Sequence, residues 1–267
     1  MEDRIGGYEI KPFSKYRKNV ALIAHEGWRR HSLNALLQVD ITEARKRIRN
    51  MKKNGKDVSF TAWIIRCLAE ALKENKELNA YRLGRNKIAV FNDVDVAIPV
   101  EKRIDDENVP MAHIVRRANE KSIEDITKEI RDVQRKEAKS NQVLIEDLSL
   151  LERFVLRAPT FIKKIILVFS RRKGLLKKKH LGTVGVTSLG MFSKFSGWII
   201  PLGGVNALLV VVNGTVKKPG VVGDEIDIRE FLHLVVSFDH DLVDGATISR
   251  FLSRFTELLE KGFDLDA

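Results

Sequence analysis

The sequence predicts an α+β fold, because amphipathic helices and alternating strands follow one another without a regular strand–helix–strand repeat. Apolar residues recur with helical spacing most clearly in 60–72 and 248–259. They alternate with a period of two most clearly in 94–100 and 232–236. These observations favour helices packed on a mixed or largely antiparallel sheet within a single domain spanning 1–267.

The amino-terminal part of the chain is predicted to pass from a basic helix into a strand and back into a helix. The basic helix lies within 12–28, and a strand covers 32–39. Thr42 is expected to cap a short helix that runs through Met51.

Ser59 is predicted to begin the clearest helix of the chain, which carries a continuous apolar stripe. The stripe consists of Phe60, Trp63, Ile64, Cys67, Leu68, Ala71 and Leu72. Strands at 87–91 and 93–100 are predicted to follow and to pair through a tight turn at Asn92–Asp93.

The carboxyl-terminal half begins with a predicted capping box formed by Ser122 and Asp125, ahead of a helical stripe. Three strands are then expected, within 182–187, 205–212 and 232–237. The final helix is expected to end before Gly262, and its stripe consists of Ile248, Phe251, Leu252, Phe255, Leu258 and Leu259.

Composition limits the classes of function. The single cysteine, Cys67, excludes an internal disulfide and a cysteine-rich zinc site, and no metal-ligand cluster is visible in the sequence. The acidic start is unlike a signal peptide, and no long uncharged apolar run spans a membrane, so we expect a cytoplasmic protein.

The net charge of +11 comes mainly from one segment, because 153–179 holds ten Lys and Arg residues and no acidic residue. Interleaved apolar and basic residues in this segment suit a membrane surface, which makes a membrane-peripheral location the alternative to a freely cytoplasmic one. A helical hairpin with a solvated basic rim, or a basic mouth that attracts phosphates, explains the same pattern. Few aromatic residues accompany the charges, so we expect no nucleic-acid partner.

A candidate catalytic group lies in the run 237–246, which contains His240 and Asp244. Histidine suits proton removal from a nucleophile because its pKa lies near ~6.5. His240 is expected in a loop between a strand and the final helix, with Asp244 four residues later and Gly245 after it.

The run Ser-Phe-Asp-His-x-x-x-Asp-Gly-Ala in 237–246 resembles the catalytic domain of the 2-oxoacid dehydrogenase acyltransferases, the dihydrolipoyl acyltransferases. Further blocks resemble the same family in the same order, and they lie at 14–18, 93–100, 118–123 and 182–192. The resemblance implies a chloramphenicol acetyltransferase-like fold, in which a mixed sheet carries packed helices and three subunits associate. It covers nearly the whole chain except about 143–181, which we interpret as an inserted basic and apolar segment.

The resemblance also implies roles for individual residues. His240 would be the general base on the incoming thiol, and Thr187 would stabilise the tetrahedral oxyanion. Ser188, next to Thr187, is the second choice for that role. In such enzymes the site forms where two subunits meet, so His240 and Thr187 would come from different chains.

The remaining implied roles are structural. Asp244 would orient the catalytic loop by pairing with Arg17 of the first helix, and Gly245 would permit a sharp turn. Asp241 departs from the family, which has a basic residue after its histidine. If Asp239, Asp241 and Asp244 surrounded the imidazole, they would favour its charged form.

The predicted function is therefore transfer of an acyl group between coenzyme A and a thiol of the dihydrolipoyl type or another small acceptor. A non-catalytic trimeric scaffold or acyl-CoA-binding relative is the alternative. No lipoyl-lysine sequence or lipoyl domain is recognisable in the chain, so the acyl carrier would act in trans. We expect a homotrimer or a larger trimer-based assembly.

Overall fold

A computed structural model of the chain describes residues 6–104, 107–139, 158–190 and 195–265. The helices are α1 Lys15–Trp28, α2 Thr42–Lys53, α3 Phe60–Glu74, α4 Ile123–Lys139, α7 Thr160–Ser170, α8 Gly174–Leu181 and α9 Gly245–Glu260. The strands are β1 Ser32–Asp40, β2 Ala80–Leu83, β3 Lys87–Val90, β4 Val96–Ile104, β5 Glu107–Val115, β6 Val184–Ser188, β7 Leu208–Val222 and β8 Glu225–Asp239. Short 3₁₀ turns occupy Lys76–Leu78 and Ala118–Glu120. The predicted α+β class is confirmed.

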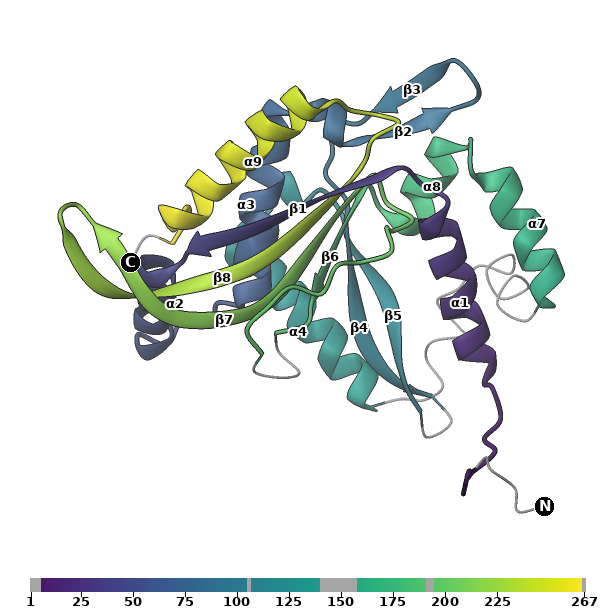
Figure 1. Cartoon of the computed structure of the whole chain (residues 1–267), viewed down its shortest axis with the longest axis horizontal. Coiled ribbons are helices and arrows are strands. Elements are labelled where there is room, and N and C mark those ends of the chain that lie inside the picture. Colours follow the sequence, from purple (N-terminus) through teal and green to yellow (C-terminus); the bar gives the residue numbers. More distant parts are fainter. Residues whose placement is uncertain (1–5, 105–106, 140–157, 191–194, 266–267) are drawn as a thin grey trace.

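One twisted sheet organises the molecule, with strand order β1-β8-β7-β6-β4-β5 (Figure 1). Strand β6 runs parallel to both of its neighbours, β4 and β7. The pairs β1–β8, β7–β8 and β4–β5 are antiparallel, so the sheet is mixed as expected. The β7–β8 hairpin extends beyond the end of β1 and forms a projecting arm (Figure 1).

The hydrophobic core lies between one face of this sheet and helices α2, α3, α4 and α9. Ser59 caps α3 as predicted, since its Oγ accepts from the Ala62 backbone N–H. Trp63 and Cys67 of α3 are fully buried. Burial raises the pKa of the Cys67 thiol, so this cysteine is a core residue.

Several local expectations are confirmed and two are wrong. The capping box is present, because Asp125 N–H donates to Ser122 Oγ at 3.1 Å and Ser122 N–H donates to Asp125 Oδ2 at 3.3 Å. Thr42 is not a cap but the first residue of α2, and its N–H and hydroxyl donate to Asp40 Oδ1. Asp40 supplies the side-chain oxygen in its place.

The predicted hairpin of 87–91 with 93–100 is also wrong. Strand β3 pairs with β2 in a separate two-stranded sheet, whereas β4 pairs with β5 and β6. Asn79, which directly precedes β2, binds the segment that joins β3 to β4: its Nδ2 donates to Phe91 O at 2.8 Å and to Asp93 O at 3.0 Å. This bridge holds the end of β3 against the start of β2 and lets the chain continue into the main sheet.

The predicted insertion, 143–181, contains α7 and α8, which pack against α1 and β2 at one end of the sheet (Figure 1). Its portion 143–157 lies outside the described residues. No helix in the described ranges is long and apolar enough to cross a membrane.

Candidate active site

His240 is the first residue after β8, at the start of the loop that leads into α9. Its side chain is exposed, and its backbone N–H donates to the backbone oxygen of His31 at 2.9 Å. The strand pairing explains this contact. Ser32 at the start of β1 pairs with Asp239 at the end of β8, so the residues just outside the two strands are neighbours.

The loop on either side of His240 is held by charged contacts. Arg30 lies 3.3 Å from Asp239 Oδ2, and His31 Nδ1 lies 2.8 Å from Asp241 Oδ1. Arg82 of β2 reaches Asp241 Oδ2 at 3.4 Å. We call this set of contacts, made by Arg30, His31 and Arg82, the loop clamp. The clamp holds the carboxylates of the two residues next to His240, and the His31 backbone holds the His240 N–H. None of these contacts involves the imidazole of His240.

The hydrogen bond to Asp241 raises the pKa of His31, and the negative charges of Asp241 and Asp239 add to it. The same hydrogen bond lowers the pKa of the Asp241 carboxyl. The acidic residues near His240 are therefore engaged with Arg30, His31 and Arg82, and the positions of Asp239 and Asp241 serve the clamp.

Asp244 caps α9. Its side chain accepts from the Thr247 backbone N–H at 2.9 Å, and this bond is the first cause that lowers the pKa of Asp244. The described contacts do not bring Asp244 to Arg17, whose side chain is exposed on α1. Gly245 has no positive φ, and an added Cβ would meet nothing within 4 Å, so this chain shows no local need for glycine there.

Thr187 and Ser188 lie half-buried at the carboxyl-terminal end of β6, where they line a cavity of about 550 Å³. Helices α2, α3 and α4 supply other walls. The cavity also carries basic and polar side chains: Arg45, Lys52, Ser59, Arg131, Gln134 and Asn213. Both predicted oxyanion donors therefore face a space large enough for a substrate.

A single chain does not bring Thr187 and His240 together. Thr187 pairs with Val211 of β7, and Val211 pairs with Val235 of β8. His240 follows Val235 by five residues, about 16 Å along a strand, and two strand spacings add about 10 Å across the sheet. Groups that act on one reacting atom must each lie about 3 Å from it.

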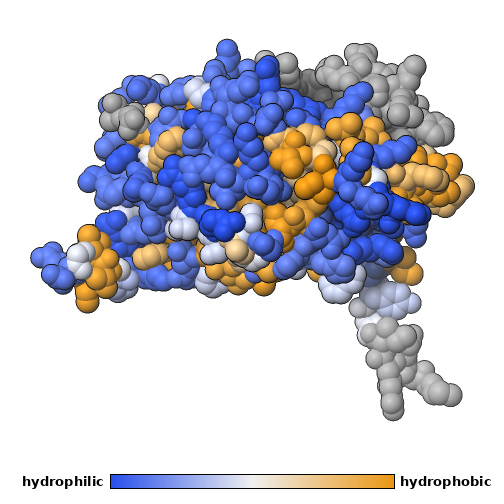
Figure 2. All heavy atoms as spheres, turned by 90° about the horizontal axis from the view of Figure 1, so that it is seen from above, coloured by the Kyte–Doolittle hydropathy of each residue, from blue (hydrophilic) through white to orange (hydrophobic). Residues whose placement is uncertain are grey.

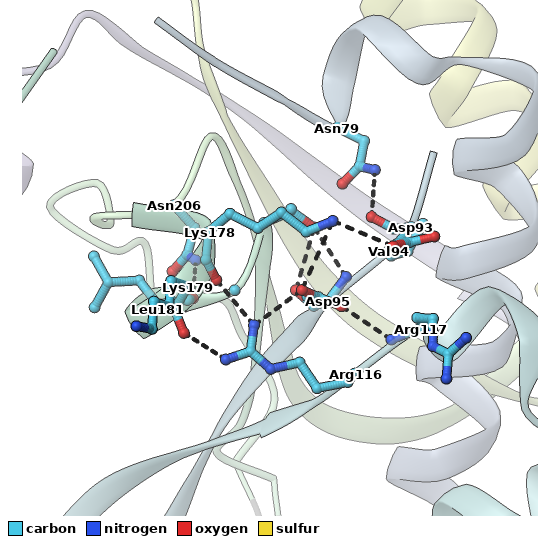
Figure 3. A network of polar contacts seen from close by, with 12 residues as sticks. Asn79, Asp93, Val94, Asp95, Arg116, Arg117, Lys178, Lys179, Leu181 and Asn206 are labelled. Atoms are coloured by element: carbon cyan, nitrogen blue, oxygen red, sulfur yellow. Dashed lines mark hydrogen bonds and ion pairs between the residues drawn. The ribbon is translucent and has the colours of Figure 1, made fainter. Parts of the chain in front are cut away.

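A polar network around the buried carboxylate of Asp95 fixes the start of β6 (Figure 3). Arg116 Nη1 donates to Asp95 Oδ2 at 3.0 Å, and the Arg117 backbone N–H donates to Asp95 Oδ1 at 2.9 Å. The Asp95 backbone joins in, since its N–H donates to Thr183 Oγ1 and its carbonyl accepts from Thr183 N–H at 2.7 Å.

The same network holds α8. Arg116 also donates to the carbonyl oxygens of Lys178 and Lys179, and Lys178 Nζ lies 3.5 Å from Asp93 Oδ2 (Figure 3). These carbonyls belong to the last turn of α8, where backbone acceptors lack helical partners. The strand that carries Thr187 is therefore anchored at its first residues.

The clamp cannot be recognised from sequence patterns, because no spacing in the sequence relates 30–31 to 239–241. The pairing of strands 32–39 and 232–237 would have supplied the signal. His233 of β8 is buried, and its ring lies 4.4 Å from that of Trp198. No group of three or more potential metal ligands occurs among the residues that the structure describes.

Comparison with known proteins gives one family. The model of the 2-oxoacid dehydrogenases acyltransferase catalytic domain matches residues 6–150 and 166–265. The interval between the matched stretches is 151–165, which is shorter than the predicted insertion, so α8 and the end of α7 from residue 166 onward belong to the matched domain.

Individual relatives agree. The lipoamide acyltransferase component of the branched-chain alpha-keto acid dehydrogenase complex of Bacillus subtilis is 26% identical over 234 residues, which are 84% of this chain and 46% of that protein. The pyruvate dehydrogenase acetyltransferase component of Rickettsia felis is 26% identical and covers 76% of this chain and 40% of its own length. The chain thus spans less than half the length of these relatives.

Solved structures share the fold. A probable dihydrolipoamide acetyltransferase from Listeria monocytogenes superposes with a TM-score of 0.69 at 25% identity, covering 96% of this chain and 95% of that one. A truncated catalytic core of a 2-oxoacid dehydrogenase complex from Thermoplasma acidophilum gives 0.67 at 18% identity, with coverage of 96% and 100%. The chain belongs to the 2-oxoacid dehydrogenase acyltransferase catalytic-domain family.

Proposed function

We propose that the chain is a coenzyme A-dependent acyltransferase that moves an acyl group between coenzyme A and a thiol of the dihydrolipoyl type. The observation that carries this proposal is the presentation of His240. The clamp fixes the loop backbone, yet the imidazole faces outward without a side-chain partner among the described residues. A general base needs this combination of fixed position and free nitrogen.

The proposed site has two halves, the imidazole of His240 and the hydroxyl of Thr187, and each has one chemical task. His240 takes the proton of the incoming thiol as its sulfur forms a bond to the thioester carbonyl carbon. The hydroxyl of Thr187, with Ser188 as the second choice, donates to the resulting oxyanion. When the intermediate collapses, the C–S bond to the departing thiol breaks, and the imidazolium returns the proton to that sulfur.

The two halves meet between subunits in this proposal. Thr187 and His240 lie at separate places on one chain, so a neighbouring copy supplies the oxyanion donor to each His240. The relatives include cores of multienzyme complexes, and a closed trimer would give every chain the same contact. We infer a homotrimer, alone or within a larger trimer-based assembly.

The cavity beside Thr187 supports coenzyme A as the substrate. Its volume of about 550 Å³ lies in the range of small-molecule sites, and Lys52 in its lining offers charge for a phosphate group, whereas Arg45 and Arg131 already pair with Glu230 and Asp57. The printed names of the relatives specify lipoamide and dihydrolipoyllysine, and the reduced, dihydro form of the lipoyl group is a dithiol. We infer that a lipoyl-bearing protein presents the other thiol in trans.

The test is acyl exchange between acetyl- or branched acyl-CoA and dihydrolipoamide. We expect turnover by the wild-type chain and a fall in kcat of about 100-fold or more in His240→Ala, the usual contribution of a general base. Unchanged turnover in that variant would contradict the mechanism. Tight binding of coenzyme A without turnover in the wild-type chain would favour the non-catalytic scaffold.

We also propose that the basic and apolar segment predicted at 153–179 contacts an anionic membrane through α7. Its exposed side chains form one stripe at helical spacing: Phe161, Ile165, Val168 and Phe169. Figure 2 shows hydrophobic side chains gathered at the end of the molecule that carries α7. Residues 158–181 hold eight Lys and Arg and no acidic residue. A symmetric contact between two copies would bring like charges together, whereas anionic lipid headgroups complement them.

A further inference from the structure

A second cavity, of about 280 Å³, lies beside the loop that carries His240 but does not include His240 in its lining. Its walls come from α1, β2, α7, α8 and the residues Asp239 and Asp241. It is separate from the cavity beside Thr187, because the two share no lining residue. Its basic side chains are Arg29, Arg30, Arg82, Arg171, Arg172 and Lys177.

Three carboxylates also line this cavity, and each already has a partner. Glu26 accepts two hydrogen bonds from Arg171, at 2.6 and 2.9 Å, and this contact lowers the pKa of Glu26. The other two carboxylates, on either side of His240, are held by Arg30 and Arg82 of the clamp.

The remaining cations, Arg29, Arg172 and Lys177, make no ion pair with any described residue. The contact that Lys177 does make is with the ring of Tyr81, whose centroid lies 5.6 Å from Nζ. Burial lowers the pKa of Lys177 to about 8, and the charge of Arg30 contributes. The charges of Asp239 and Glu26 act on Lys177 in the opposite direction, but both carboxylates already pair with arginines, Arg30 and Arg171. A half-buried amine whose neighbouring carboxylates are already paired is costly to keep charged, and a bound anion would reduce that cost.

We propose that this cavity binds the phosphate or carboxylate group of a small anionic ligand through Arg29, Arg172 and Lys177. Guanidinium groups bind such oxyanions through paired hydrogen bonds, and a lysine adds a compact charge. Arg30 and Arg82 line the same cavity and also hold Asp239 and Asp241. An anion bound in this cavity would therefore lie next to two residues of the clamp. Any effect of that anion on acyl transfer rests on the proposed function of His240.

Isothermal titration of the full chain with inorganic phosphate tests the binding, with chloride at the same ionic strength as the reference. Phosphate should bind, and Lys177→Gln and Arg172→Gln should each weaken its affinity by about tenfold, as expected for one charge-assisted hydrogen bond. Lys179→Gln is the matched control, because it removes the same charge from the same helix at an exposed position outside the cavity. Equal phosphate affinity in the wild-type chain and all the variants would overturn the proposal. So would the absence of phosphate binding by a wild-type chain whose melting curve shows that it is folded.

The pH dependence gives a second readout. Lys177 is charged below about pH 8, so phosphate binding should weaken as the pH rises through that value, and Lys177→Gln should remove this dependence. Competition by coenzyme A would identify the phosphates of the acyl donor as the source, and independent binding would identify a free anion. Both are measured without turnover, so a failure here leaves the His240→Ala test untouched.

Discussion

Arg30 and His31 are consecutive residues that hold three consecutive residues of the loop that carries His240. Arg30 binds the Asp239 carboxylate, the His31 backbone oxygen accepts from His240 N–H, and the His31 ring binds Asp241. Asp241 thus has a partner on the facing strand end. The position of the His240 backbone depends on a contact that titrates.

The contact between His31 and Asp241 should hold the loop only within a limited pH range. His31 has a raised pKa in the folded chain, so its pair with Asp241 is fully formed below the ordinary value of 6.5 and is lost as the pH rises through the raised value. Asp241 has a lowered pKa, so the pair is lost on the acid side only below about 3.8. Exchange protection of the His240 amide should therefore be greater in wild type than in His31→Gln at mildly acidic pH, and equal at alkaline pH.

The measurement is the exchange rate of the His240 amide in wild type divided by the rate in His31→Gln at the same pH. This ratio cancels the intrinsic pH dependence of exchange. His25→Gln is the control, because His25 is an exposed histidine of α1 that lies outside the clamp. A ratio that stays constant across the pH range would show that the side chain of His31 does not hold the loop.

The candidate site could be predicted only in part from the sequence. His240, Thr187 and Asp244 stand in motifs, and the strand and helix ends where they lie follow from local patterns. The clamp, the Asp95 network and the anion cavity join segments that are far apart in the chain, such as 95 with 183 and 31 with 241. Their partners become neighbours only through strand pairing, which residue periodicity does not specify.

At the scale of elements, α7 differs from the other amphipathic helices of the fold. Helices α3 and α9 bury their apolar stripes against the sheet. The stripe of α7 remains exposed, although α8 and α1 pack against this helix.

One part of the strands is also not evident from sequence patterns. The arm of β7 and β8, residues 217–230, was not predicted. There the two strands pair only with each other, and Ile226 and Ile228 alternate with Asp227 yet remain exposed.

The α7 stripe gives a prediction about lipid binding. The protein should co-sediment with vesicles that contain phosphatidylglycerol and not with vesicles of phosphatidylcholine alone. Ile165→Ser combined with Phe169→Ser should lower the partition by about tenfold or more, since two exposed apolar side chains lose their burial in the bilayer. Val221→Ser with Ile226→Ser, on the exposed β7–β8 arm, is the matched control and should bind like wild type.

The charge contribution has its own control. Lys164→Ser with Lys173→Ser should weaken binding to the anionic vesicles, whereas Lys53→Ser with Lys56→Ser removes the same net charge elsewhere and should not. Absence of lipid binding, together with a changed oligomeric mass in the Ile165 and Phe169 variant, would instead show that α7 contacts another copy of the chain.

At the scale of the whole molecule, the sheet separates the two halves of the proposed site. His240 lies where β8 ends next to the start of β1, whereas Thr187 lies at the far end of β6, beside the helices α2 to α4. The distance between them is set by strand register, which side-chain motion does not change. The proposed activity therefore belongs to an assembly of chains.

Mixing of variants tests this arrangement. His240→Ala and Thr187→Ala should each have little activity alone, because each removes one half of every site. Co-assembled rings contain contacts where an intact His240 meets an intact Thr187, so activity should return to at most about one third of the wild-type level. Ser188→Ala replaces Thr187→Ala if the neighbouring hydroxyl is the donor. Mixtures that stay as inactive as their parents, despite exchange of subunits shown by native mass measurement, would place both groups in one chain.

Because His240 and Thr187 of one chain lie apart, the number of complete sites depends on how many contacts between chains an assembly has. In a head-to-tail ring every chain gives one half-site and receives one, so a closed trimer completes a site at each of its contacts. An open pair of chains completes only one site and leaves two halves unused. Specific activity should therefore fall on dilution in step with ring opening, at concentrations where each chain is still folded.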